Sequence, residues 1–233
     1  MKLDVLEKLN AARNARQAAI LVTDTESGAV RLVVEKDGYD ADPLREELAA
    51  RFATGASGMM ANGTVFLTVH LPPPRLVVIG AVHISQALAP MAKLTGFDLT
   101  IVDPRTAFAT PERFAGVPLL AEWPDDALPG LDLDPFTGLV ALTHDPKIDD
   151  GAIVAGLRAG CFYVGALGSR KTHGRRLERL REAGVDEASL ARIRAPIGIA
   201  IGAQSPAEIA VAILAEVIAA LRSRGVAANE AAA

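Results

Sequence analysis

The chain has 233 residues, of which 50% are hydrophobic and 22% are charged, and its formal net charge is −4. This composition is typical of a folded globular protein and excludes a largely disordered one. The negative net charge excludes a general attraction to nucleic acids or anionic membranes, so an anionic ligand must be bound by a local cluster.

The first 71 residues predict a small α+β unit. We expect helices over residues 4–18 and 42–52, and strands over residues 18–23, 30–35 and 64–71. Three consecutive prolines follow at 72–74, and such a run joins neither a helix nor a central strand. We therefore place a linker at 72–74 between two domains, 1–71 and 75–223.

From residue 75 onward, strands and helices alternate. Short runs of branched apolar residues predict buried strands at 76–79, 99–102, 138–143 and 162–164. Helical patterns lie at 85–95, 147–159, 169–183 and 205–222. The predicted fold class is therefore α/β, a Rossmann-like doubly wound parallel sheet preceded by the small α+β unit. Residues 224–233 lack a core pattern and predict a flexible tail.

The turn after the first of these strands holds the first candidate site. In a dinucleotide-binding fold this place carries Gly-x-Gly-x-x-Gly, which lets the backbone approach a pyrophosphate at a helix N-terminus. Gly80 is present, but Val82 and Ser85 replace the second and third glycines. The position favours a Rossmann-like turn, and the residues disfavour standard NAD binding. His83 begins the helix, where it either contacts a ligand or caps its own turn.

Asp103 ends the second strand, 23 residues after Gly80. That spacing is close to the one for an acid that binds a ribose in dinucleotide-binding folds. Alternatively, Asp103 caps the turn that Pro104 fixes, and both interpretations stay open.

Thr143, His144 and Asp145 directly follow the strand at 138–143. Their side chains should emerge at the carboxyl edge of the sheet, where open α/β sheets bind ligands. His144 and Asp145 are therefore candidate ligand contacts. Asp145 also precedes Pro146, so it could instead cap the next helix.

The segment from Gly165 to Lys171 has the composition of an anion-binding site. A strand runs into Gly165 and Gly168, and Ser169 and Arg170 begin the next helix. Backbone N–H groups, a positive helix dipole, a hydroxyl and cations converge in such a place. Further along this helix we expect Arg179 and Arg181 to pair with Glu178 or Glu182 of the same helix.

Gly198 and Gly202 lie in a loop before the last helix. They either let an extended segment pass close to a ligand or allow tight packing of that helix. We expect Cys161 to be buried and to pack as a small apolar residue, in preference to serving as a reactive thiol. A lone cysteine allows no intrachain disulfide and no cysteine-based metal site, and we expect no metal site. The N-terminus has no apolar core of the kind found in signal peptides, so we expect a cytoplasmic protein.

Taken together, these segments resemble the C-terminal domain of the xanthine dehydrogenase accessory protein family (XdhC/CoxI type). The resemblance covers roughly residues 75–222, and its motifs occur in order at 80–85, 101–105, 143–145, 163–170, 195–198 and 202–210. It implies an accessory factor that binds molybdenum cofactor, a phosphate-bearing pterin (molybdopterin) with a dithiolene-held metal. Such a factor delivers the cofactor to an apo molybdenum hydroxylase such as xanthine dehydrogenase.

On this interpretation no residue is catalytic, and the protein is a chaperone more than an enzyme. The candidate cofactor-binding residues are Gly80, His83, Asp103, Arg105, His144, Asp145, Gly165, Gly168, Ser169, Arg170, Gly198 and Gly202. Family members usually begin with a domain that carries Gly-Ser-x-Pro-Arg and Gly-Gly-Cys segments. Residues 1–70 contain neither, so the first domain is short or degenerate here.

Two other functions fit the same residues. One is an NAD(P)-dependent oxidoreductase in which His144 or His83 would donate or accept a proton. The other is a regulatory module that senses a nucleotide. The apolar helix over residues 209–221 either packs on the sheet or forms the face of a homodimer.

Overall fold

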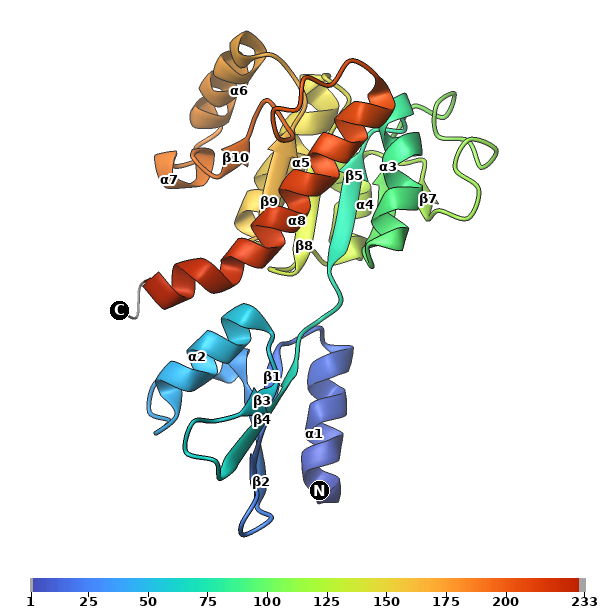
Figure 1. The fold of residues 1–233 in the computed structure, drawn as a ribbon. Helices are drawn as coiled ribbons and strands as arrows, with labels where there is room; N and C mark the ends of the chain where they lie inside the picture. The colour runs from blue at the N-terminus through green and yellow to red at the C-terminus, as the bar shows by residue number, and fades with distance from the viewer. Residues whose placement is uncertain (1, 231–233) are drawn as a thin grey trace. The chain divides into compact units, whose positions relative to one another are not determined.

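The chain separates into two units (Figure 1). One comprises the residues up to Pro72 together with those from Arg222 on, and the other spans Pro73–Leu221. A computed structural model describes residues 2–230 and the side chains of residues 2–223. Within the described residues, no helix has the length and apolar character that crossing a membrane requires.

The first unit is an antiparallel sheet with the strand order β2-β1-β4-β3. Its strands are β1 (Ala19–Asp24), β2 (Val30–Val34), β3 (Gly58–Met59) and β4 (Val65–His70). Its helices are α1 (Leu3–Asn14) and α2 (Arg45–Thr54), together with a short 3-10 turn, η1 (Glu35–Asp37).

Strand β1 is the centre of this unit because its apolar residues are buried on both faces. Successive side chains of a strand point to opposite faces. Ala19 and Leu21 form a core with Val5 and Leu9 of α1. Helix α2 contacts β1 and β4, and it buries Leu48.

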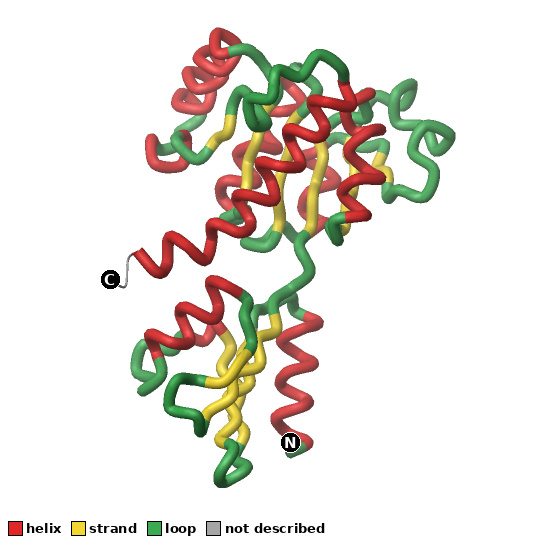
Figure 2. The backbone as a smooth tube through the Cα atoms, viewed as in Figure 1, coloured by secondary structure: helices red, strands yellow, loops and turns green. Residues whose placement is uncertain are grey.

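The second unit is a parallel sheet of six strands flanked by helices (Figure 2), which confirms the predicted fold class. The strands are β5 (Arg75–Ile79), β6 (Asp98–Val102), β7 (Leu119–Leu120), β8 (Thr137–Ala141), β9 (Tyr163–Ala166) and β10 (Ile193–Arg194). Their order across the sheet is β10-β9-β8-β5-β6-β7. This is the doubly wound order of dinucleotide-binding folds, and the winding reverses between β5 and β8.

Helices cover both faces of the parallel sheet. They are α3 (His83–Leu94), α4 (Pro124–Leu131), α5 (Pro146–Arg158), α6 (Arg170–Glu182), α7 (Glu187–Leu190) and α8 (Pro206–Glu230). Leu76 and Val78 point into a core with α3 and α8, whereas Val77 and Ile79 point into the core with α4 and α5. This double burial explains the continuous apolar run of β5.

Several elements differ from the sequence-based prediction. The short strands β3, β7 and β10 and the helices α4 and α7 were not expected. The last helix was expected to end at Arg222, but α8 continues to Glu230. The tail predicted for 224–233 therefore overlaps this helix, and residues 231–233 lie outside the described part of the chain.

Candidate functional site

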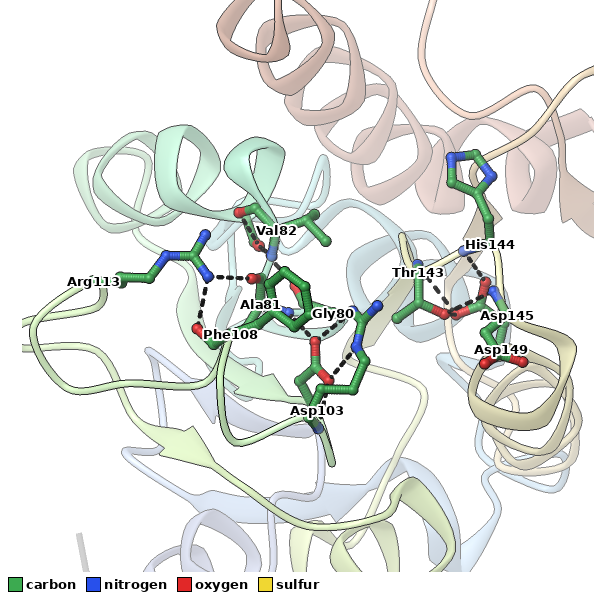
Figure 3. A network of polar contacts seen from close by, with 12 residues as sticks. Gly80, Ala81, Val82, Asp103, Phe108, Arg113, Thr143, His144, Asp145 and Asp149 are labelled. Carbon is green, nitrogen blue, oxygen red and sulfur yellow. Dashed lines mark hydrogen bonds and ion pairs between the residues drawn. The ribbon is translucent and has the colours of Figure 1, made fainter.

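The candidate site lies at the carboxyl ends of β5 and β8, where the winding of the sheet reverses (Figure 3). Gly80 follows β5 with a φ of 120°, and a Cβ there would lie 3.0 Å from Cγ2 of Thr143. The two loops therefore touch, and only glycine allows this approach. Helices α3, α5 and α6 all begin at this same edge, since each follows a parallel strand. Their positive ends favour an anion.

Ser85 closes the turn between β5 and α3. Its hydroxyl is fully buried, accepts a hydrogen bond from the Val82 N–H at 2.8 Å and lies 2.7 Å from the Gly80 carbonyl oxygen. Ser85 is therefore part of the turn and not a degraded ligand-binding glycine. His83 does not form this cap, and its side chain is exposed at the first position of α3.

Asp103 is fully buried at the end of β6, and its carboxylate is saturated with hydrogen bonds. One oxygen accepts from the Ala81 N–H at 2.7 Å and from Nη2 of Arg105 at 2.7 Å. The other accepts from the Arg105 N–H and Nε, both at 2.9 Å. Burial raises the pKa of Asp103, but these hydrogen bonds outweigh it and hold the pKa below its usual value. The carboxylate thus fixes the turn at Ala81 and positions Arg105.

Phe108 and Arg113 complete this side of the edge, and no periodic pattern in the sequence singles them out. The Arg105 guanidinium lies 4.7 Å from the centre of the half-exposed Phe108 ring. Nη1 of Arg113 donates to the carbonyl oxygens of Ala81 at 3.1 Å and Phe108 at 2.8 Å. These contacts tie the loop after β6 to the turn after β5.

Asp149 of α5 binds the loop after β8 through hydrogen bonds. The Thr143 hydroxyl donates to Oδ1 of Asp149 at 2.7 Å, and the His144 N–H donates to Oδ2 at 3.0 Å. His144 has a φ of 64°, a left-handed conformation that is unfavourable for a non-glycine residue by about 1–2 kcal/mol. Such strain at a loop tip persists only where the surroundings hold it, and it is a marker of functional positions.

Asp145 has the geometry of a helix cap. Its Oδ1 accepts from the Lys147 N–H at 3.0 Å at the start of α5, and Pro146 occupies the first helical position. The capping interpretation is therefore observed. The exposed carboxylate still stands at the strand-end edge, so a contact with a ligand stays a prediction.

The loop after β9 brings Gly168 next to His144 and leads into Ser169. A Cβ on Gly168 would lie 3.9 Å from Nδ1 of His144. Ser169 caps α6 by accepting from the Thr172 N–H at 3.2 Å. The N–H groups of Arg170 and Lys171 then lack intrahelical acceptors, as first-turn amides do, and both side chains are exposed.

The arginines further along α6 were expected to pair with acids of their own helix, but they pair with acids of neighbouring elements. Arg179 binds Asp150 of α5 through two hydrogen bonds of 2.6 and 3.1 Å. Arg181 pairs with Glu187 of α7. The expectation was wrong because acids of neighbouring elements lie within reach, and these pairs join α6 to α5 and α7.

Three of the glycines predicted to bind the cofactor differ in how closely other atoms pack against them. A Cβ on Gly165 would lie 2.6 Å from the Tyr163 ring and 2.7 Å from Cδ1 of Ile197, and one on Gly198 would lie 3.1 Å from the backbone of α8. These two glycines are required for packing. A Cβ on Gly202 would meet nothing within 4 Å, although its φ of 72° favours glycine.

Cys161 is fully buried, and burial raises the pKa of its thiol to about 12. This agrees with the predicted apolar role. Among the described residues, no group of three or more His, Cys, Asp or Glu side chains is arranged to hold a metal ion. The helix N-termini and the cations Arg105, Arg170 and Lys171 at this edge are features that favour an anion.

The profile of the XdhC Rossmann domain matches residues 76–217, which include this whole edge. The chain belongs to the XdhC family. The predicted resemblance is thereby confirmed.

Curated XdhC-type relatives are between 31% and 37% identical to the chain over the segments that align. The Escherichia coli protein YqeB, which is uncharacterized, is 37% identical over 72% of this chain and 32% of its own length. The E. coli molybdenum cofactor insertion chaperone PaoD is 31% identical over 77% of this chain and 50% of its own. A Bacillus subtilis protein, named as a probable subunit of xanthine dehydrogenase, is 32% identical over 63% of this chain and 43% of its own length. The chain thus spans between a third and a half of the length of these relatives.

A solved structure shows the same fold. It is a Bacillus halodurans protein described as a xanthine dehydrogenase, with a TM-score of 0.65 and 22% identity. The match covers 94% of this chain and 64% of the other.

Proposed function

We propose that this chain binds molybdenum cofactor at the carboxyl edge of its parallel sheet and passes it to a molybdenum hydroxylase of the xanthine dehydrogenase type. The observation that carries the proposal is that α3, α5 and α6 begin at the same edge of the sheet, with α3 and α5 following the two strands between which the winding reverses. The phosphate of the pterin would be bound by the first-turn amides of α6 and the side chains of Ser169 and Arg170.

The relatives support the choice of ligand. PaoD is named as an insertion chaperone for molybdenum cofactor, and it aligns with most of this chain. The name of the B. subtilis relative supports a client of the xanthine dehydrogenase type. The cofactor is cargo in this proposal, so the edge must bind it and release it. Exposed cations and amides on loops suit a reversible contact.

The geometry weighs against the oxidoreductase alternative. A dinucleotide fold presents a carboxylate with a free oxygen to the ribose at the end of its second strand. The Asp103 carboxylate already accepts four hydrogen bonds from Ala81 and Arg105. Val82 also adds bulk where a pyrophosphate would approach the backbone.

The test is a cofactor-release assay. The chain is produced in a host that makes molybdenum cofactor, purified without oxygen, denatured and oxidised, and the fluorescent pterin product is quantified. Stoichiometric pterin is the expected result. Absence of pterin together with retention of NAD(P) would contradict the proposal and restore the oxidoreductase hypothesis.

A transfer assay completes the test. Chain loaded with cofactor is mixed with an apo molybdenum hydroxylase, and the recovered hydroxylase activity is compared with that from the same amount of free cofactor. Faster or fuller recovery from the loaded chain is expected. Equal recovery from free cofactor would contradict delivery without contradicting binding.

A further inference from the structure

Arg176 and Asp149 form a buried ion pair between α6 and α5. The Arg176 side chain is 2% exposed and the Asp149 side chain 0%, and Nη2 of the arginine lies 3.8 Å from Oδ2 of the aspartate. Nε of Arg176 also lies 3.6 Å from Asp150. Removing two charges from water costs several kcal/mol for each ion, so the fold alone would be served as well by apolar residues.

Each partner of this pair holds a different loop of the strand-end edge. Asp149 accepts hydrogen bonds from Thr143 and from the strained His144 backbone. Nη2 of Arg176 donates to the Leu167 carbonyl oxygen at 3.2 Å, directly before Gly168. The ion pair thus gives the loop after β8 and the loop after β9 a direct buried connection.

The two loops meet on the ligand side as well, because Nδ1 of His144 lies close to Gly168. Burial raises the pKa of Asp149, and the charge of Arg176 opposes this shift and favours the carboxylate. Loss of the arginine would therefore weaken the acceptor that holds His144, even though Arg176 does not touch His144.

We infer that Asp149 and Arg176 are positioning residues, a buried clasp that sets the conformation of His144 relative to Gly168 and Ser169. This inference rests on the proposed function only in the role that it gives to the positioned groups, which would contact the cofactor. The effect of the ion pair on the conformation of the loops can be tested without any ligand.

The test measures amide hydrogen exchange by NMR at Thr143 and His144 in the ligand-free chain. Arg176→Met removes the charge and keeps much of the volume. We expect exchange at these amides to accelerate by about tenfold or more relative to exchange at the Val140 amide of β8. The reason is that their hydrogen bonds to the Asp149 carboxylate weaken. A purely structural contribution would accelerate Val140 equally.

Two further variants keep the outcome decisive. Arg179→Met removes a more exposed arginine that joins the same two helices, and exchange at Thr143 and His144 should stay as in the unmodified chain. Arg176→Lys keeps the charge and should give a smaller acceleration, but a compact ammonium does not span the positions of Nε and Nη2.

Unchanged relative exchange in the Met variant would overturn the inference. If the Met variant does not fold, unchanged exchange in the Lys variant overturns it. The pterin-release assay on the unmodified chain tests the proposed function separately. Absence of pterin with accelerated exchange in Arg176→Met would contradict the function and leave the clasp standing.

Discussion

At the scale of single residues, two buried aspartates organise the strand-end edge without facing the ligand themselves. Asp103 fixes the turn after β5 from the neighbouring strand, and Asp149 fixes the loop after β8 from within α5. In the proposed function, these carboxylates position Arg105 and His144 as groups that would meet the cofactor. Ser169 and Arg170 at the start of α6 would contribute further contacts.

The first prediction concerns these last two residues. Ser169→Ala combined with Arg170→Ala should reduce the pterin retained per chain, because a hydroxyl and a cation leave the first turn of α6. Loss of the cap should cost only about 1 kcal/mol, so the domain stays folded. Pterin release and thermal unfolding measure the two effects.

Asp186→Ala is the matched control. It removes the cap of α7, which leads into β10 at the amino edge of the sheet. It should cost similar stability and leave pterin retention unchanged. Equal retention in the Ser169/Arg170 double variant and this control would remove the proposed anion contacts from the site.

The second prediction separates packing glycines from ligand-binding ones. Gly165→Ala should lower stability by about 1–3 kcal/mol, because the new methyl group would collide with Tyr163 and Ile197. Gly174→Ala in α6 meets nothing and should raise stability by about 0.5–1 kcal/mol. Chemical denaturation measures both. A neutral Gly165→Ala would show that the strand can shift and that packing does not require this glycine.

At the scale of elements, the sequence-based prediction succeeded where local chemistry decides the structure. The strands from β5 to β9 follow from apolar runs, apart from β7, and the starts of α5, α6 and α8 follow from their capping residues. Ser205 and Glu208 form the expected reciprocal cap, with hydrogen bonds of 3.2 Å in both directions.

The missed elements lack such signals. β7 and β10 have two residues each, too few for periodicity, and α4 contains Pro129 and Gly130, which look like helix breakers. Asp149 and Arg176 look like surface charges along helices. Their burial depends on how α5 and α6 pack together, which no local pattern specifies.

The third prediction concerns the contact between β9 and α8. Tyr163 donates to Glu216 at 2.6 Å, and the Gly198 N–H donates to the same carboxylate oxygen at 2.7 Å. Burial, together with the hydrogen bond to Glu216, raises the pKa of Tyr163 well above its usual value of 10.0. The folded chain should therefore show no Tyr163 ionisation near pH 10, as measured by the ultraviolet absorbance of tyrosinate.

The consequence for stability has a definite sign. Because the folded pKa is the higher one, the stabilisation is fully present below about pH 10 and declines as the pH rises beyond it. Tyr163→Phe should lose about 1 kcal/mol at neutral pH and show a weaker decline above pH 10. Tyr39→Phe, in the first unit, removes the other of the two tyrosines, so that the tyrosinate absorbance then reports on Tyr163. Ionisation of Tyr163 at its ordinary pKa in the folded chain would contradict the described contact.

At the scale of the whole chain, each unit has a hydrophobic core of its own. Leu48 is fully buried in the first unit, and Leu139 is fully buried in the second. The boundary between the units falls within the run of prolines, between Pro72 and Pro73. We therefore propose that the two units are separate folding domains.

The fourth prediction follows from this arrangement. Leu48→Ala should destabilise the first unit by about 2–5 kcal/mol through the cavity it leaves, while the second unit keeps its transition. Leu139→Ala should do the reverse. Differential scanning calorimetry of the full chain measures both transitions. A single transition that moves as a whole in both variants would show that the units unfold together.

The saturated carboxylate of Asp103 also bears on redesign of the site. An engineer who wished to turn this domain into a dinucleotide-dependent scaffold would replace Val82 by glycine first. That change alone leaves Arg105 bound to the acid that a ribose needs, so the guanidinium must be removed as well. Such a replacement, however, would also remove the contact of Arg105 with the Phe108 ring in the loop after β6. Reprogramming the ligand preference of this fold therefore requires rebuilding a loop, and substituting residues in the glycine turn is not sufficient.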